Sequence, residues 1–246
     1  MILEGSVYKF NQFSQYKQLV HGFSTSDFGS LKVKDPEWIK RQVMFAQQLS
    51  IDPEKIMRML QVHSSTIAWV DQHDVGATIE NTDGLITKEK NIFLAVSTAD
   101  CVPILLFDRY KKVVGAIHAG WRGLYSEIIP KAIAEMVMEG SNPADILAGI
   151  GPCIRSCCYS IDTKRKELFE EKFKNNVDEP VSYFVACEGK LYLNLPLLAR
   201  LQLQEAGVLE ENIEDSEICT KENESFYSYR RQGEESGRFL GLIGLI

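Results

Sequence analysis

Histidine is scarce in this 246-residue chain, which has only His21, His63, His73 and His118. Four imidazoles are too few for a true multicopper laccase, because a blue-copper centre and a trinuclear cluster together take many more histidine ligands. Basic residues are also outnumbered by acidic ones: the chain has 27 Lys and Arg, 34 Asp and Glu, and a net charge of −7. Binding to nucleic-acid phosphates needs clustered positive charge, so nucleic acid is not an expected partner.

Long apolar runs and linkers are missing as well. No stretch reaches the roughly 18 apolar residues of a membrane helix, and Glu4 and Lys9 stand where a signal peptide would be apolar. We therefore expect a cytoplasmic protein with no membrane partner, whose six cysteines stay reduced and are mostly core residues. No repeat or Gly/Ser/Pro-rich segment divides the chain, which predicts one domain over residues 1–246.

Apolar periodicity predicts strands and helices that do not alternate strictly. We expect strands at 91–99, 103–107, 113–119, 146–150, 182–187, 190–194 and 239–246, and helices at 36–49, 126–139, 163–174 and 195–206. A further helix-like run precedes His63. This mixture predicts an α+β or α/β fold, with mixed β-sheets flanked by helices in a single compact domain.

Three side chains form a candidate metal site. His63 follows the helix-like run, Cys101 follows the strand predicted at 91–99, and His118 closes the strand predicted at 113–119. Two imidazoles and one thiolate leave the fourth tetrahedral position open, as in catalytic zinc sites. The same ligand set occurs in blue-copper centres, so copper stays possible. The spacing matches no local zinc motif, and on spacing alone a buried Cys with two hydrogen-bonded histidines is favoured over a metal site.

Asp100, Trp121 and Arg122 are candidates for work beside a metal. Asp100 precedes Cys101 and can orient a metal-bound imidazole, or else cap a local turn. Arg122 lies between two glycines before a predicted helix, where backbone N–H groups attract phosphate, although an arginine packed on Trp121 is the alternative. The aromatic candidates for stacking on a planar base are Trp121, Phe28 and Tyr159. Asp83 is followed by glycine, and an Asp-Gly pair indicates a turn.

Several motifs in fixed order resemble the YfiH-type laccase-domain family. In chain order, the matching segments are His21 to Thr25, Gln61-Val62-His63, Ser97 to Pro103, Ile117 to Gly123, Gly149 to Ile154, and Phe226 to Arg231. Members of that family are described as purine nucleoside phosphorylases with adenosine deaminase and methylthioadenosine phosphorylase activities, formerly called multicopper polyphenol oxidoreductases. The resemblance implies zinc at His63, Cys101 and His118, and purine nucleosides and phosphate as small-molecule partners. From the terminal motifs, Ser24, Arg230 and Arg231 become candidate substrate-binding residues.

Two departures from the family pattern stand out. Ser26 replaces the usual Arg after the first Thr, which puts an anion contact from that loop in doubt. Ser160 replaces the Glu of the family's Tyr-Glu-Val and removes a possible carboxylate.

The alternative functions are a copper-dependent polyphenol oxidase, a metal-free hydrolase with Cys101 as nucleophile, and a non-catalytic scaffold. Cys157 and Cys158 are too close in sequence to form a metal cage alone, so we expect them to pack in core and loop. The sequence does not indicate an oligomeric state.

Overall fold

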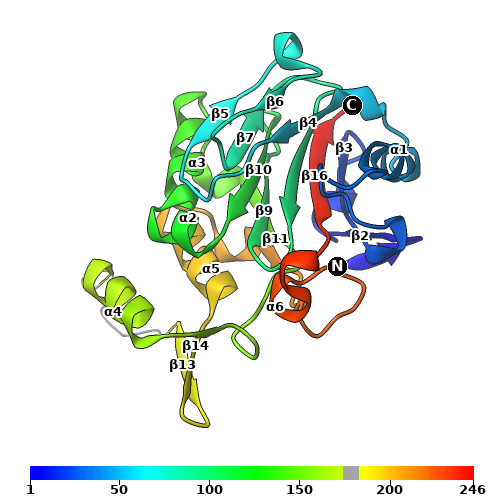
Figure 1. The fold of residues 1–246 in the computed structure, drawn as a ribbon. Helices are drawn as coiled ribbons and strands as arrows, with labels where there is room; N and C mark the ends of the chain where they lie inside the picture. Colours follow the sequence, from blue (N-terminus) through cyan, green and yellow to red (C-terminus); the bar gives the residue numbers. More distant parts are fainter. Residues whose placement is uncertain (174–182) are drawn as a thin grey trace.

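Two β-sheets pack face to face in the computed structural model, which describes residues 1–173 and 183–246 (Figure 1). The first sheet has the order β1 (Ile2–Glu4), β2 (Val7–Lys9), β3 (Leu19–Ser24), β16 (Phe239–Leu245), β8 (Phe93–Thr98), β4 (Ile56–Met59) and β6 (Thr78–Ile79). The second sheet has the order β15 (Ile213–Asp215), β11 (Ile146–Ile150), β9 (Val102–Asp108), β10 (Val113–Ala119), β7 (Gly84–Thr87) and β5 (Ile67–Trp69). Parallel and antiparallel pairs occur in both, so the predicted mixed sheets are confirmed.

The two-residue period of the strands produces four layers. In β8, Leu94 and Val96 join the core between the sheets, while Ala95 faces the opposite way. The outer face of the first sheet is covered by α1 (Trp38–Gln48), as Figure 1 shows. On the second sheet, Leu105 and Phe107 point to the central core. The other strand faces pack under α3 (Ile128–Met138) and α5 (Leu195–Glu205). Each fully buried large apolar side chain stabilises this arrangement by about 1.5–3 kcal/mol.

Helix ends follow local chemistry. The helix predicted at 126–139 is confirmed as α3, but it starts at Ile128, because Glu127 has a φ of 58° and separates it from the short α2 (Trp121–Tyr125). Asn194 caps α5 by accepting a hydrogen bond from the Leu197 N–H, and Pro196 lies in its first turn. The other described helices are α4 (Thr163–Lys172), capped by Asp162, and α6 (Tyr229–Gln232).

A three-stranded sheet completes the described strands, in the order β12 (Ser160–Ile161), β14 (Lys190–Leu193) and β13 (Phe184–Cys187). The strands and helices predicted with residue bounds all occur within a few residues of those bounds. Residues 174 and 182, at the ends of two of the predicted elements, lie outside the described residues. Within the described part of the chain, no helix has the length and apolar character needed to cross a membrane.

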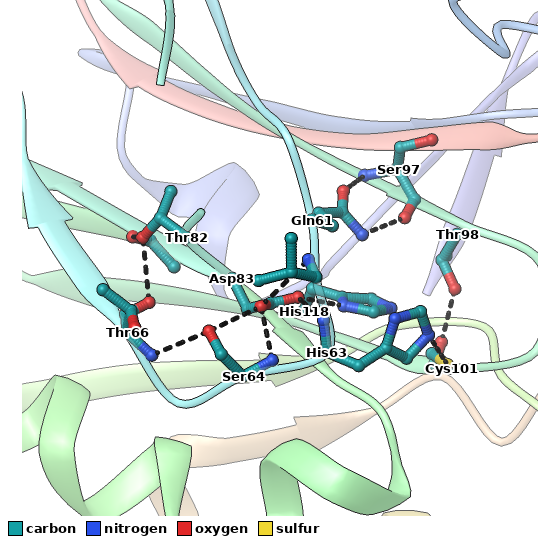
Figure 2. A network of polar contacts seen from close by, with 12 residues as sticks. Gln61, His63, Ser64, Thr66, Thr82, Asp83, Ser97, Thr98, Cys101 and His118 are labelled. Carbon is teal, nitrogen blue, oxygen red and sulfur yellow. Dashed lines mark hydrogen bonds and ion pairs between the residues drawn. The ribbon is translucent and has the colours of Figure 1, made fainter. Parts of the chain in front are cut away.

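The helix-like run before His63 was predicted wrongly. A 3₁₀ turn at Pro53–Lys55 leads into strand β4, which pairs in parallel with β8 through Ile56 and Met57. The residues of β4 are all buried, so apolar periodicity does not separate a strand from a helix here. After β4 the chain runs irregularly from 60 to 66, and His63 in this segment lies beside His118, the penultimate residue of β10 (Figure 2).

Candidate metal centre

Strand register brings the three predicted ligands together. In the β9–β10 pair, His118 lies opposite Pro103, two residues after Cys101. The turn between β8 and β9 therefore places the Cys101 thiol beside the His118 imidazole. His63 approaches from the loop after β4, with its ring centroid 4.8 Å from that of His118. Figure 2 shows the three side chains converging.

Their spacing suits a tetrahedral metal ion. One nitrogen from each histidine and the Cys101 Sγ all lie within 4.8 Å of one another. The Sγ of Cys101 is 3.9 Å from His63 Nε2. Zinc bonds of about 2.3 Å to sulfur and 2.0–2.1 Å to nitrogen imply a separation of about 3.6 Å at the tetrahedral angle. For this pair a shift of a few tenths of an ångström closes the difference, and the two imidazoles and one thiolate are a donor set that suits a metal.

Asp83 organises the site, although the sequence indicated only a turn there. Its Oδ1 lies 2.8 Å from His118 Nδ1, so the other ring nitrogen of His118 is free to face the metal position. The same fully buried carboxylate accepts backbone N–H bonds from Val62, His63 and Ser64. Asp83 therefore orients one ligand and holds the loop that carries another (Figure 2).

The backbone around the ligands is constrained. His63 and Asp100 have φ values of 61° and 104°, a region that non-glycine residues adopt only when their surroundings hold them there. Gln61 supplies part of that hold by exchanging two hydrogen bonds with the backbone of Ser97, at 2.8 and 2.9 Å. At Gly120 a Cβ would lie 2.9 Å from Cys101 Sγ, so only glycine leaves room for the thiol.

Charge coupling makes the ligands reactive before any metal binds. Burial raises the pKa of the Cys101 thiol, but the His118 charge and hydrogen bonds from both histidines outweigh it and lower the pKa to about 6. For His118, burial lowers the pKa, yet Cys101 and Asp83 raise it to about 9. Burial also opposes ionisation of Asp83, but the His118 and Ser64 hydrogen bonds lower its pKa to about 2. A thiolate next to an imidazolium is the result.

The three ligands open into a cavity of about 590 Å³, a usual size for a small-molecule site. Trp121 and Tyr159 line it, as do Arg165, Arg230 and Arg238. The guanidinium of Arg165 lies 4.5 Å from the Trp121 ring centroid, and that of Arg230 lies 5.0 Å from the Tyr159 ring centroid. The cavity thus combines a metal position, aromatic faces and positive charge.

Comparison with known proteins identifies the family. The family model described as multi-copper polyphenol oxidoreductase laccase matches residues 16–246. The chain belongs to this family. It is 33% identical to purine nucleoside phosphorylase YlmD of Bacillus subtilis, over 93% of this chain and 89% of the relative. It is also 34% identical to adenosine deaminase RL5 of an unknown prokaryotic organism, over 82% and 79%. The crystal structure of Bacillus licheniformis hypothetical protein YfiH superposes with a TM-score of 0.88 at 32% identity, covering 99% and 97% of the two chains.

In this family member, some of the predicted substrate residues line the cavity and others do not. Trp121 and Arg230 line the cavity. Arg122 is exposed and stacks on Trp121 at 4.5 Å without being among the lining residues. Ser24 is fully buried, and its Oγ accepts from the Leu240 N–H. Arg231 donates to the backbone carbonyls of Thr220, Lys221 and Phe226, so its hydrogen bonds brace the C-terminal segment.

Asp100 does not orient a histidine, contrary to one of the two roles expected for it. Its carboxylate instead accepts from Thr220 Oγ1 at 2.7 Å and from the Arg230 N–H at 2.6 Å. Asp100 therefore ties the Cys101 turn to the C-terminal segment of this family member. The histidine-orienting carboxylate is Asp83, which sequence reasoning missed because its partner stands 35 residues away on a neighbouring strand.

Sequence reasoning also missed the cavity role of Arg165, and it assigned no firm role to Arg238. Arg165 lies in α4, a helix rich in charged residues to which the sequence analysis assigned no functional residue. Ser160 is one of the two residues that depart from the family pattern. Its carbonyl oxygen and its hydroxyl oxygen both lie 3.2 Å from Arg230 Nη1. A neutral partner thus takes the position of the family's carboxylate and leaves the charge of Arg230 uncompensated there. Phe28 packs against Phe45 in the core, which removes it from the stacking candidates.

Proposed function

We propose that this chain is a zinc-dependent purine nucleoside phosphorylase that accepts adenosine, inosine and methylthioadenosine and also deaminates adenosine. The observation that carries the proposal is the convergence of His63, Cys101 and His118 at a cavity lined by aromatic rings and arginines. The names of the relatives, purine nucleoside phosphorylase and adenosine deaminase, support the same substrate class.

The residues that would hold the metal are His63, Cys101 and His118. Zinc bound there would supply Lewis acidity, which suits activation of water for attack on C6 of adenine or polarisation of a phosphate oxygen. Asp83 keeps the His118 ring in the orientation and tautomer that ligation needs. Copper is the alternative metal, because the ligand set also suits it.

The cavity walls suit a nucleoside and an anion. Trp121 and Tyr159 offer flat apolar surface to a purine. Arg165 and Arg230, each stacked on one of these rings, present guanidinium groups suited to phosphate oxygens. In phosphorolysis, a phosphate oxygen bonds to C1′ of the ribose as the bond from C1′ to the purine nitrogen breaks. The departing base keeps the electron pair and takes up a proton, and the products are free base and ribose 1-phosphate.

Metal analysis and product analysis on the same preparation test the proposal. Protein purified without added metal is expected to contain zinc at the His63 site, and Cys101→Ala is expected to lose it. Chromatography is expected to show phosphate-dependent release of adenine from adenosine, and inosine as the product of deamination. Cleavage that is equal with and without phosphate would show a nucleoside hydrolase instead. No turnover of any nucleoside would favour the scaffold function.

A metal-free hydrolase is the second candidate, because the Cys101 thiol has a pKa of about 6 and lies beside His63 and His118. Chelation separates the two mechanisms. The phosphorylase proposed here loses activity when the metal is stripped and regains it with added zinc. A Cys–His hydrolase stays active in chelator and is inactivated by thiol alkylation.

A further inference from the structure

A second group of metal-binding side chains lies outside the cavity. Cys157 and Cys158 belong to the loop between β11 and β12, and Cys219 and Glu222 belong to the turn that follows β15. One ligand atom from each of these four residues lies within 4.8 Å of all the others. The Sγ atoms of Cys157 and Cys219 are 3.6 Å apart, and all six cysteines are free thiols. The sequence near Cys157 and Cys158 offers too few ligands for a metal ion, and the fold adds Cys219 and Glu222 from about 60 residues further along the chain.

Backbone contacts hold the two segments in place without a ligand. Cys153 donates its N–H to the carbonyl of Ile218, and its own carbonyl accepts from the Thr220 N–H. Beside this bridge, Arg155 pairs with Asp215 through two hydrogen bonds of 2.9 and 2.7 Å. These contacts place the Cys219 thiol opposite the Cys157–Cys158 pair, so a metal would meet a preorganised site.

We propose that Cys157, Cys158, Cys219 and Glu222 bind a second zinc ion, distinct from the one at His63, Cys101 and His118. Zinc–sulfur bonds of about 2.3 Å at the tetrahedral angle put two sulfurs about 3.8 Å apart, close to the 3.6 Å between Cys157 and Cys219. Three thiolates select a thiophilic cation over Mg²⁺ or Ca²⁺. Four protein ligands leave no open position, which is the pattern of a structural zinc.

The charges around the group favour a cation. Glu217, Glu222 and Glu224 line the hollow into which Cys157 and Cys219 open. Without a cation, burial raises the pKa of Cys158, and burial together with hydrogen bonds from Cys158 and Cys219 raises the pKa of Cys157. Each thiol that binds the ion as a thiolate releases its proton to solvent. Arg155, in the same hollow, offsets part of the negative charge of the loaded site.

The second ion would connect two segments that border the cavity. Cys158 is followed by Tyr159, whose ring lines the cavity. Cys219 is followed by Thr220, which donates to Asp100, the residue before the metal ligand Cys101. Tying Cys158 to Cys219 thus fixes the distance between a cavity wall and the turn that carries a ligand. This role makes the second zinc structural, with no contact to substrate.

Metal counting tests the proposal independently of activity. Wild-type protein is expected to bind two zinc ions per chain, and Cys219→Ser one. Cys187→Ser is the matched control, because Cys187 is an exposed cysteine of β13 outside both groups, and it is expected to keep two. Cys101→Ala is expected to lose the other ion, and the double variant Cys101→Ala/Cys219→Ser to lose both. If Cys219→Ser keeps the wild-type count, or wild type holds a single ion that Cys101→Ala removes, the second site does not exist.

Two further measurements test the site even if Cys219→Ser does not fold: Co²⁺ spectroscopy and the milder variant Glu222→Gln. With Co²⁺ as the probe, Cys101→Ala is expected to keep strong thiolate charge-transfer absorption from three sulfurs, whereas Cys219→Ser keeps only the weak band of one. Glu222→Gln retains the three thiols and is expected to lose the ion to a chelator about tenfold faster or more. A Cys157–Cys219 disulfide in protein purified under reducing conditions, detected by intact mass, would overturn the proposal.

Discussion

Asp83 and His118 form a buried pair whose Oδ1 and Nδ1 atoms are 2.8 Å apart. The pairing is fixed by backbone register, because β7 and β10 place Gly84 opposite Ile117 and the His118 N–H donates to the Asp83 carbonyl at 2.7 Å. The same carboxylate holds the backbone of residues 62–64. One side chain therefore controls the geometry of two of the three proposed metal ligands.

Asp83→Asn is expected to weaken zinc binding at the His63, Cys101 and His118 site by about tenfold to a hundredfold, as loss of a ligand-orienting carboxylate does elsewhere. The amide offers one acceptor oxygen where the carboxylate serves both His118 and the loop. Competition with a chromophoric chelator measures the affinity. Asp52→Asn is the control, because Asn also suits the exposed cap that Asp52 forms with the Glu54 N–H. Equal affinities for both variants and wild type would contradict the role of Asp83.

Gly120→Ala is expected to disturb the same site by steric contact alone. The added Cβ would lie 2.9 Å from Cys101 Sγ and 3.3 Å from His63 Cδ2, so the two ligands have to separate. Elemental analysis should show reduced zinc, with loss confined to the His63 site. Gly115→Ala, in strand β10, is the matched control, because its Cβ would meet neighbours at 3.4 Å or more. Full zinc content in Gly120→Ala would show that the site has more room than its atoms indicate.

Arg230→Ala is expected to raise the KM for phosphate about tenfold to a hundredfold, since a charge-assisted hydrogen bond is worth roughly 1.5–3 kcal/mol. Arg230 lines the cavity, whereas Arg122 stacks on Trp121 outside the lining residues. We expect Arg122→Ala to change this KM by about threefold or less. Steady-state kinetics at varied phosphate, with zinc content measured in parallel, gives the comparison. The opposite order of effects would place phosphate at the start of α2, where the sequence motif alone puts it.

His21 is expected to make the fold acid-sensitive. Its Nε2 accepts the Phe10 N–H at 2.9 Å, and burial lowers its pKa from 6.5 to about 3. Because the unfolded chain binds a proton that the folded chain does not, this contribution is complete above pH 6.5 and is lost as the pH falls toward 3. The slope is about 1.4 kcal/mol per pH unit within that window.

Urea unfolding in chelator between pH 4 and 6 measures this slope without interference from metal release. In His21→Gln the amide oxygen can still accept the Phe10 N–H, but no proton binds, so its unfolding free energy should depend less steeply on pH than that of wild type. Parallel pH dependences for the two proteins would show that His21 is protonated in the folded chain.

The layered fold was largely predictable, because strands buried on both faces appear in the sequence as short apolar runs between turns. The runs at 91–99 and 113–119 became β8 and β10, and alternating residues of each strand face two different cores. The helix-like run before His63 was predicted wrongly. Strand β4 is short and buried along its whole length, so it has no exposed face whose period would distinguish a strand from a helix.

The sequence by itself determined which residues offer metal-binding chemistry at the cavity, because four histidines leave few choices and strand ends are where such residues collect. Only the tertiary structure decided what surrounds them. Asp83 meets His118 across 35 residues, and Cys157 meets Cys219 across 62. Contacts over such distances depend on strand register and on which loops share an edge. Local composition and periodicity do not specify those relationships, because they arise only when the sheets pair and pack.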